Sequence, residues 1–247
     1  MASRQSPGGR STKAERKEQA RQQRLELQRR AVRARRNRRI AFGVVVVVVA
    51  GTAAFALTRP SNAVADPDEL LETGTQASQA AGCGSVEDVG PYQPESEDAA
   101  HTAAIPPLST YPSVPPASGP HNEIPLGEGV YDEPPPIDRL IHSLEHGAAI
   151  VWYSPDARGR ALDDVRAFYE DSDVGNRVIV APYDYPDQGE AGQLPAGTQM
   201  TLVAWHFVER CRDVSLGAAF EFTSKYTFPV YDDRQYAGEA PEPGGGF

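Results

Sequence analysis

The sequence lacks the short motifs that mark several common classes of active and binding sites. It contains no G-x-S-x-G nucleophile turn, no P-loop glycine pattern and no G-x-G-x-x-G dinucleotide fingerprint. It also contains no EF-hand loop and no internal repeat. These absences argue against an esterase of the nucleophile-elbow type, against nucleotide binding through those loops, and against an EF-hand calcium sensor.

Cysteine is scarce, with only Cys83 and Cys211 in the chain. They do not form a C-x-x-C motif, so nothing indicates a redox-active pair. In an oxidising compartment we expect them to form one structural disulfide, while free thiols or a metal ligand are the alternatives. The chain-entropy model gives such a long loop closure an upper estimate of about 4–5 kcal/mol.

Basic residues are scarce after residue 39. Residues 1–39 carry 14 basic and 3 acidic side chains, whereas residues 40–247 carry 10 basic and 31 acidic ones. The acidic part therefore does not attract nucleic acid electrostatically. We interpret residues 1–39 as a basic cytoplasmic arm that contacts anionic lipid, with a nucleic-acid-binding or partner-binding arm as the alternative.

Residues 40–58 contain no charged side chain over 19 positions, which predicts one transmembrane helix. The arginine-rich segment that precedes them predicts a cytoplasmic N-terminus and an extracytoplasmic C-terminal part, as in an uncleaved signal anchor of a single-pass cell-membrane protein. The alternative is a cleaved signal peptide, because Ala63-Val64-Ala65 resembles a cleavage site with the cut after Ala65.

The rest of the chain predicts a small, compact α+β domain at residues 83–236 with a Pro-rich, irregular N-terminal part. Residues 59–82 are small and polar, so we expect a stalk linker with one helical turn near 68–71. Residues 237–247 have the composition of a disordered tail. Periodicity predicts helices at 136–146 and 159–171, strands at 148–153, 177–183 and 198–207, and a helix rather than a strand at 216–223.

Histidines gather around the first of these helices. His142 and His146 are four residues apart and therefore share a helix face, and His121 in the preceding loop can supply a third ligand. This set predicts a zinc or copper site. The pentapeptide HSLEH also matches H-x-x-E-H, in which Glu145 would be the base of a metal-dependent hydrolase, but Gly147 ends the helix too early for that fold.

Other candidate ligands are weaker. His206 is a candidate extra ligand on the strand face that it shares with Ala204 and Val208. Met200 is either core or a soft copper ligand, and we expect His101 to be solvated in its loose Pro-rich segment.

A polar network without a metal is the competing interpretation of the same residues. His142 and Glu145 can hydrogen-bond to nearby loop backbone, and His146 lies at the negative end of the helix dipole. The domain would then be a non-catalytic structural or protein-interaction domain of the cell envelope. The sequence does not decide between the two, and it establishes no enzymatic reaction.

Several stretches resemble one known family in the right order. They are Gly82-Cys83-Gly84, PPASGPH (115–121), GVYDEPPP (129–136), IHSLEHGAAIVWY (141–153) and TLVAW (201–205). Over residues 80–235 the chain resembles domain of unknown function 3105, a family of secreted or membrane-anchored bacterial type. The resemblance implies that SGPH and HSLEHG belong to one module, but it confers no activity. This chain has His206 where the family pattern leads us to expect glycine, so His206 is not expected in a shared site.

Overall fold

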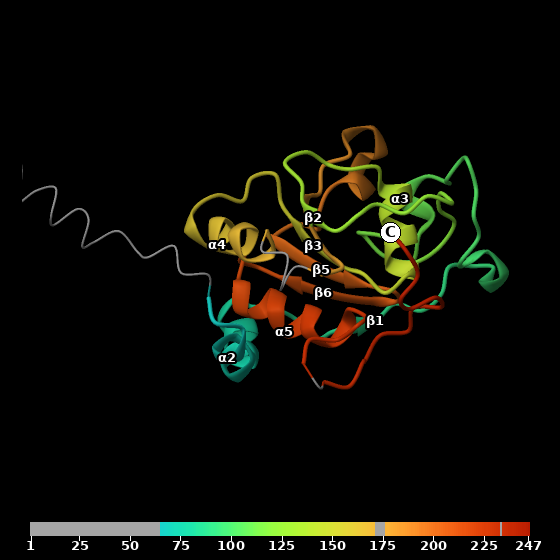
Figure 1. Ribbon diagram of the computed structural model, residues 1–247. Helices are drawn as coiled ribbons and strands as arrows, with labels where there is room; N and C mark the ends of the chain where they lie inside the picture. Colours follow the sequence, from blue (N-terminus) through green and yellow to red (C-terminus); the bar gives the residue numbers. More distant parts are fainter. Residues whose placement is uncertain (1–64, 171–175, 233) are drawn as a thin grey trace, which may run out of the picture. The chain divides into compact units, whose positions relative to one another are not determined.

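A mixed six-stranded β-sheet forms the middle layer of the folded part (Figure 1). The computed structural model describes residues 65–170, 176–232 and 234–247. The strand order is β1-β6-β5-β3-β4-β2, with β3 parallel to β4, β4 parallel to β2, and the other neighbours antiparallel. The strands are β1 (Glu87–Asp88), β2 (Gly129–Val130), β3 (Ala149–Tyr153), β4 (Val178–Pro182), β5 (Met200–Ala204) and β6 (Phe207–Cys211).

Helices cover both faces of this sheet. They are α2 (Pro67–Ala80), α3 (Ile137–Glu145), α4 (Arg160–Tyr169) and α5 (Leu216–Tyr226), with short 3-10 turns at Glu95–Glu97, Leu108–Thr110 and Pro186–Gly192. Figure 1 shows α3 and the Pro-rich loops on one side and α4 and α5 on the other. Mixed helix and strand content around one sheet confirms the α+β prediction.

Alternation along β3 explains how the two faces are separated. Ile150 and Trp152 pack in the apolar cluster that contains Leu140 and Leu144 of α3. Val151 packs in the other cluster, with α4 and α5. Because successive strand residues point to opposite faces, a strand covered on both sides is apolar throughout, as the sequence AIVWY is.

The segment predicted as one strand at 198–207 is in fact the first half of a hairpin. Strand β5 ends at Ala204, Trp205 and His206 form the turn, and the second strand of the hairpin, β6, begins at Phe207. His206 has φ +66°, in the left-handed region that favours glycine. This conformation gives a physical reason for the glycine expected there from the family pattern.

Residues 67–80 form a full helix where we expected a single turn. Asp66 caps α2 by accepting a hydrogen bond from the Asp68 N–H, and Pro67 occupies the first turn. The helix packs closely on α5: a Cβ added at Gly217 would lie 2.6 Å from the Cβ of Ala77. Part of the expected stalk is therefore packed on the domain.

The predicted disulfide between Cys83 and Cys211 is confirmed. It joins the segment that follows α2 to the last residue of β6, across a sequence separation of 128 residues. By the chain-entropy argument, this bond restricts the unfolded chain more than any short-range contact can.

The predicted basic arm, transmembrane helix and Ala63-Val64-Ala65 cleavage site lie wholly or mainly outside the described residues. Among the helices in the part that the structure describes, none is both long enough and apolar enough to cross a bilayer.

Glu209 on β6 is a buried carboxyl group whose protonation should control stability. Burial, followed by the nearby Glu221, raises the pKa of Glu209 to about 7, although Lys225 acts in the opposite direction. A raised folded-state pKa means that its stabilising contribution is full below about pH 4.5 and is lost as the pH rises through about 7.

At pH 8.5 we therefore expect Glu209→Gln to have a higher melting temperature than wild type. The increase should be about 2–4 °C for each kcal/mol by which the substitution raises the free energy of unfolding. The difference should vanish near pH 4.5. Thermal unfolding followed by circular dichroism at both pH values tests this, with the exposed Glu190→Gln as the matched control. An equal difference at both pH values would contradict the assignment.

Candidate metal centre

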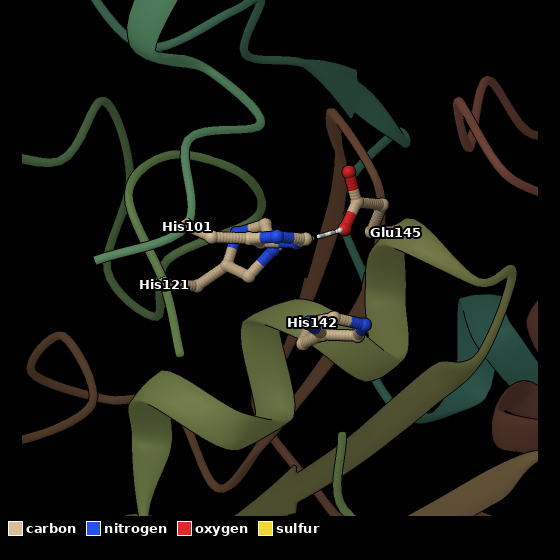
Figure 2. A group of neighbouring side chains, drawn as sticks. All are labelled: His101, His121, His142 and Glu145. Carbon is tan, nitrogen blue, oxygen red and sulfur yellow. Dashed lines mark hydrogen bonds and ion pairs between the residues drawn. The ribbon is translucent and has the colours of Figure 1, made fainter. Parts of the chain in front are cut away.

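Four side chains meet beside α3: His101, His121, His142 and Glu145. One potential ligand atom from each lies within 4.8 Å of the others. Figure 2 shows the rings of His101 and His121 next to the helix that carries His142 and Glu145, with a dashed line to the Glu145 carboxylate. This His₃Glu group can hold a metal ion.

The sequence of α3 explains why two of these residues face away from the core. Pro136 precedes the first helical residue, and Gly147 with φ +87° follows the end. Leu140 and Leu144 are fully buried against the sheet. His142 and Glu145 are three residues apart and so lie together on another face, toward the Pro-rich loops.

The other two ligands come from irregular segments that pair with each other. His101 and His121 form an isolated parallel bridge, in which the His121 N–H donates to the Ala100 carbonyl at 2.9 Å and the Thr102 N–H donates to the His121 carbonyl at 2.7 Å. His121 is fully buried, whereas the His101 side chain is 47% exposed. Backbone pairing therefore places both imidazoles opposite α3.

A buried aspartate ties these loops to the sheet. The Asp98 carboxylate accepts hydrogen bonds from the Tyr92 N–H at 2.6 Å and the Ser118 hydroxyl at 2.5 Å, and its other oxygen lies 2.8 Å from His206 Nε2. The Gly119 N–H donates to the Asp98 carbonyl. Asp98 thus fixes the segment that leads into His121.

Three histidines have Nδ1 engaged by a backbone carbonyl. Nδ1 of His121 lies 2.8 Å from the Gly119 oxygen, and Nδ1 of His142 lies 2.7 Å from the Asn122 oxygen. Nδ1 of His146 lies 2.8 Å from the oxygen of Gly246. A carbonyl only accepts, so each Nδ1 carries the proton, and in the neutral ring Nε2 is left with a lone pair.

These lone pairs face other acceptors. Nε2 of His121 lies 2.9 Å from Oε2 of Glu145, and Nε2 of His142 lies 3.1 Å from Nε2 of His146. Two acceptors at such distances need a proton or a cation between them. Two ligands bound tetrahedrally to zinc at its usual bond lengths are about 3.4 Å apart, so these separations suit a shared ion.

Charge at the site also suits a cation. Burial acts to raise the pKa of Glu145, but hydrogen bonds and charge from His121 and His101 outweigh it and lower the pKa. A bound cation would replace the proton in those hydrogen bonds. Burial lowers the pKa of His142, with further lowering by His146 and His121. An ionised carboxylate and a neutral imidazole are the forms that bind metal.

The last residues of the chain pack against His146. We expected a disordered tail at 237–247, but the Glu242 N–H donates to the Glu145 carbonyl and the Gly244 N–H donates to the His146 carbonyl, each at 3.1 Å. These carbonyls at the end of α3 have no partner within the helix. The tail satisfies them, which is a physical reason for its order.

The structure brings only some of the predicted ligands together. His121 and His142 belong to the four-residue group, whereas His146 lies beside His142 and outside that group. Glu145, predicted as a base, is placed among the ligand atoms. His206 contacts Asp98 and Glu239 instead; Met200, the candidate copper ligand, is fully buried in the core.

His101 was missed by the sequence analysis, which expected it to be solvated. Its side chain is about half exposed, but Nε2 lies 3.2 Å from the Glu145 carboxylate. The contact depends on pairing between two irregular segments, which has no periodicity to reveal it. Its identity as a histidine was the one signal in the sequence that could have suggested a ligand.

Comparison with models of known protein families gave a match to the chain. The model described as "Protein of unknown function (DUF3105)" matches residues 108–239. The chain belongs to this family. The DUF3105 match contains His121, His142 and Glu145, while His101 and Cys83 precede it. The resemblance noted from the sequence is thereby confirmed.

Neither the curated proteins nor the solved structures gave a significant match to the chain. No activity is therefore carried over to this DUF3105 chain from a relative, and any function has to be argued from the residues of the site.

The pair of His206 and Asp98 predicts a pH-dependent stability. Burial acts to lower the pKa of His206, but Asp98 and Glu239 raise it overall; burial acts to raise the pKa of Asp98, but His206 and other hydrogen bonds lower it overall. The His206 contribution is full below about pH 6.5 and is lost as the pH rises through its folded value. The Asp98 contribution is lost only as the pH falls below about 4.

His206→Asn keeps a side chain that tolerates φ +66° but removes the charge. We expect it to lower the melting temperature by about 2–4 °C per kcal/mol lost at pH 5.5, and by less at pH 9. Differential scanning calorimetry at both pH values measures this. A loss that grows from pH 5.5 to pH 9 would refute the charge-pair account.

Proposed function

We propose that this DUF3105 chain is a membrane-anchored extracytoplasmic protein whose folded domain binds a transition-metal ion, zinc or copper. The ligands are His101, His121, His142 and Glu145, whose ligand atoms lie within 4.8 Å of one another. The process that the bound ion serves is a separate question from the binding itself.

The orientation of His121 and His142 carries the proposal. Backbone carbonyls hold Nδ1 of both rings, and Nε2 of His121 then points at a carboxylate oxygen 2.9 Å away. Metal-binding histidines ordinarily donate their second ring N–H to a carbonyl or carboxylate, which fixes the tautomer and the ring orientation. The arrangement around α3 follows that rule.

The kind of ligand narrows the choice of ion. Imidazole nitrogens suit zinc and copper, whereas magnesium and calcium prefer an all-oxygen shell. Three imidazoles and one carboxylate complete a four-coordinate zinc shell. Both cysteines are joined in the disulfide, so thiolates do not compete for the ion.

The membrane location rests on the sequence together with the disulfide. Residues 40–58 are long and apolar enough to span, and the preceding basic arm would contact anionic lipid on the cytoplasmic side. A disulfide between Cys83 and Cys211 suits an oxidising compartment on the other side. These observations support a single-pass protein of the cell membrane.

Ligation suits Glu145 better than general-base catalysis. A single oxygen, Oε2, lies within hydrogen-bond distance of both His101 and His121. Its lowered pKa also opposes a role as a base that titrates near neutral pH. The hydrolase interpretation of H-x-x-E-H therefore has no observation in its favour.

Metal content of the purified full chain tests the proposal. We expect about one equivalent of zinc or copper by elemental mass spectrometry after reconstitution in detergent at pH 8. Glu145→Gln and His121→Asn should each weaken binding by at least about tenfold in competition with a chromogenic chelator.

Glu190→Gln is the matched control, because this exposed carboxylate lies outside the ligand group and the variant should bind as wild type does. Wild type that takes up no zinc or copper would contradict the proposal. If His121→Asn were then also destabilised, the histidines would act only in ordering the loops.

Metal binding should also stabilise the fold. An ion at a hundred times its dissociation constant adds about 2.7 kcal/mol to the free energy of unfolding. For a domain of this size we expect the melting temperature to rise by about 5–10 °C and to return on chelation. An equal rise in Glu145→Gln would show that the ion acts elsewhere.

A further inference from the structure

Two further potential ligands, His146 and Glu242, lie next to the first group, on the side of the C-terminal residues. Nε2 of His142 is 3.1 Å from Nε2 of His146, and Nε2 of His146 is 3.6 Å from Oε2 of Glu242. His142 thus stands between the His₃Glu group and a pair formed by His146 and Glu242. In the first group the His121 and Glu145 side chains are buried and the His101 side chain is 47% exposed, whereas the Glu242 side chain is 64% exposed.

The residues after Glu242 pack against the His146 side chain. Nδ1 of His146 donates to the Gly246 carbonyl at 2.8 Å, and the guanidinium of Arg177 donates to the carbonyls of His146 and Gly245. A Cβ added at Gly245 would lie 2.6 Å from the His146 ring, so a side chain there has no room. The GGG sequence is what lets the backbone lie directly on this imidazole.

These contacts leave Nε2 of His146 free to bind a metal ion. Its Nδ1 proton is used by a carbonyl, so the Nε2 lone pair of the neutral ring points at Nε2 of His142. Two imidazoles that face each other in this way can share one ion, because their 3.1 Å separation is close to the distance of about 3.4 Å between two ligands of a tetrahedral zinc ion.

We propose that His142, His146 and Glu242 form a second subsite for the same class of divalent transition-metal ion, which passes between the two sets by exchange of ligands on His142. The proposal rests on the metal-binding function proposed above. Nε2 of His142 has one lone pair and cannot bind two ions together. The two sets are therefore occupied in turn, and Glu242, whose side chain is more exposed than that of His101, marks the end at which the ion enters and leaves.

Release kinetics of the full chain test the relay. Zinc-loaded protein in detergent is mixed with excess chromogenic chelator, and release is followed by stopped-flow absorbance. We expect His146→Asn to bind one ion with an affinity within about threefold of wild type and to release it about tenfold more slowly. Glu242→Gln should slow release in the same direction, and the control Glu190→Gln should leave the release rate unchanged.

A second experiment removes the first set of ligands. The double variant His101→Asn/Glu145→Gln should keep a weaker zinc site through His142 and His146. Adding His146→Asn to this double variant should weaken the residual zinc binding about tenfold further.

The outcomes separate the two proposals. Zinc binding with release rates that His146→Asn and Glu242→Gln leave unchanged would overturn the relay and leave the four-ligand site standing. Residual binding that is indifferent to His146→Asn would also overturn the relay. A wild-type chain that binds no zinc at all would overturn both.

Discussion

Hydrogen bonds from imidazole to backbone carbonyls are the interaction on which the site depends. The carbonyls of Gly119, Asn122 and Gly246 each accept a hydrogen bond from Nδ1 of one histidine. Each bond orders an irregular segment and also decides which nitrogen is free. The same imidazole rings can therefore order the loops through Nδ1 and bind a metal through Nε2. The metal site and the structural polar network, which the sequence left as alternatives, are compatible with each other.

Rigid elements hold those carbonyls and rings in place. Helix α3 packs Leu140 and Leu144 into one face of a sheet whose central strand is buried on both sides. Asp98 fixes the loop before His121, and the end of the chain satisfies carbonyls at the end of α3. Loops without regular structure can thus present ligands with little freedom, which lowers the entropic cost of binding.

Periodic features could be predicted from the sequence and pairings between distant irregular segments could not. The helix around His142 and the strand AIVWY follow from apolar spacing, and the disulfide follows from the presence of two cysteines and the expectation of an oxidising compartment. His101 was missed because its backbone pairing with His121 joins two irregular segments. The hairpin turn was missed because His206 occupies a left-handed position where glycine or asparagine would have indicated a turn. The tail after residue 237 looks disordered by composition, yet it gains partners from unsatisfied helix carbonyls.

X-ray absorption at the metal edge of the reconstituted full chain measures the ligand shell of the proposed His₃Glu centre. The account predicts a low-coordinate shell of nitrogen and oxygen at about 2.0–2.2 Å, with outer-shell scattering from three imidazole rings. Glu145→Gln should change the first shell and keep the imidazole scattering. A shell made of water oxygens, or one with sulfur from the cysteines, would contradict the His₃Glu centre.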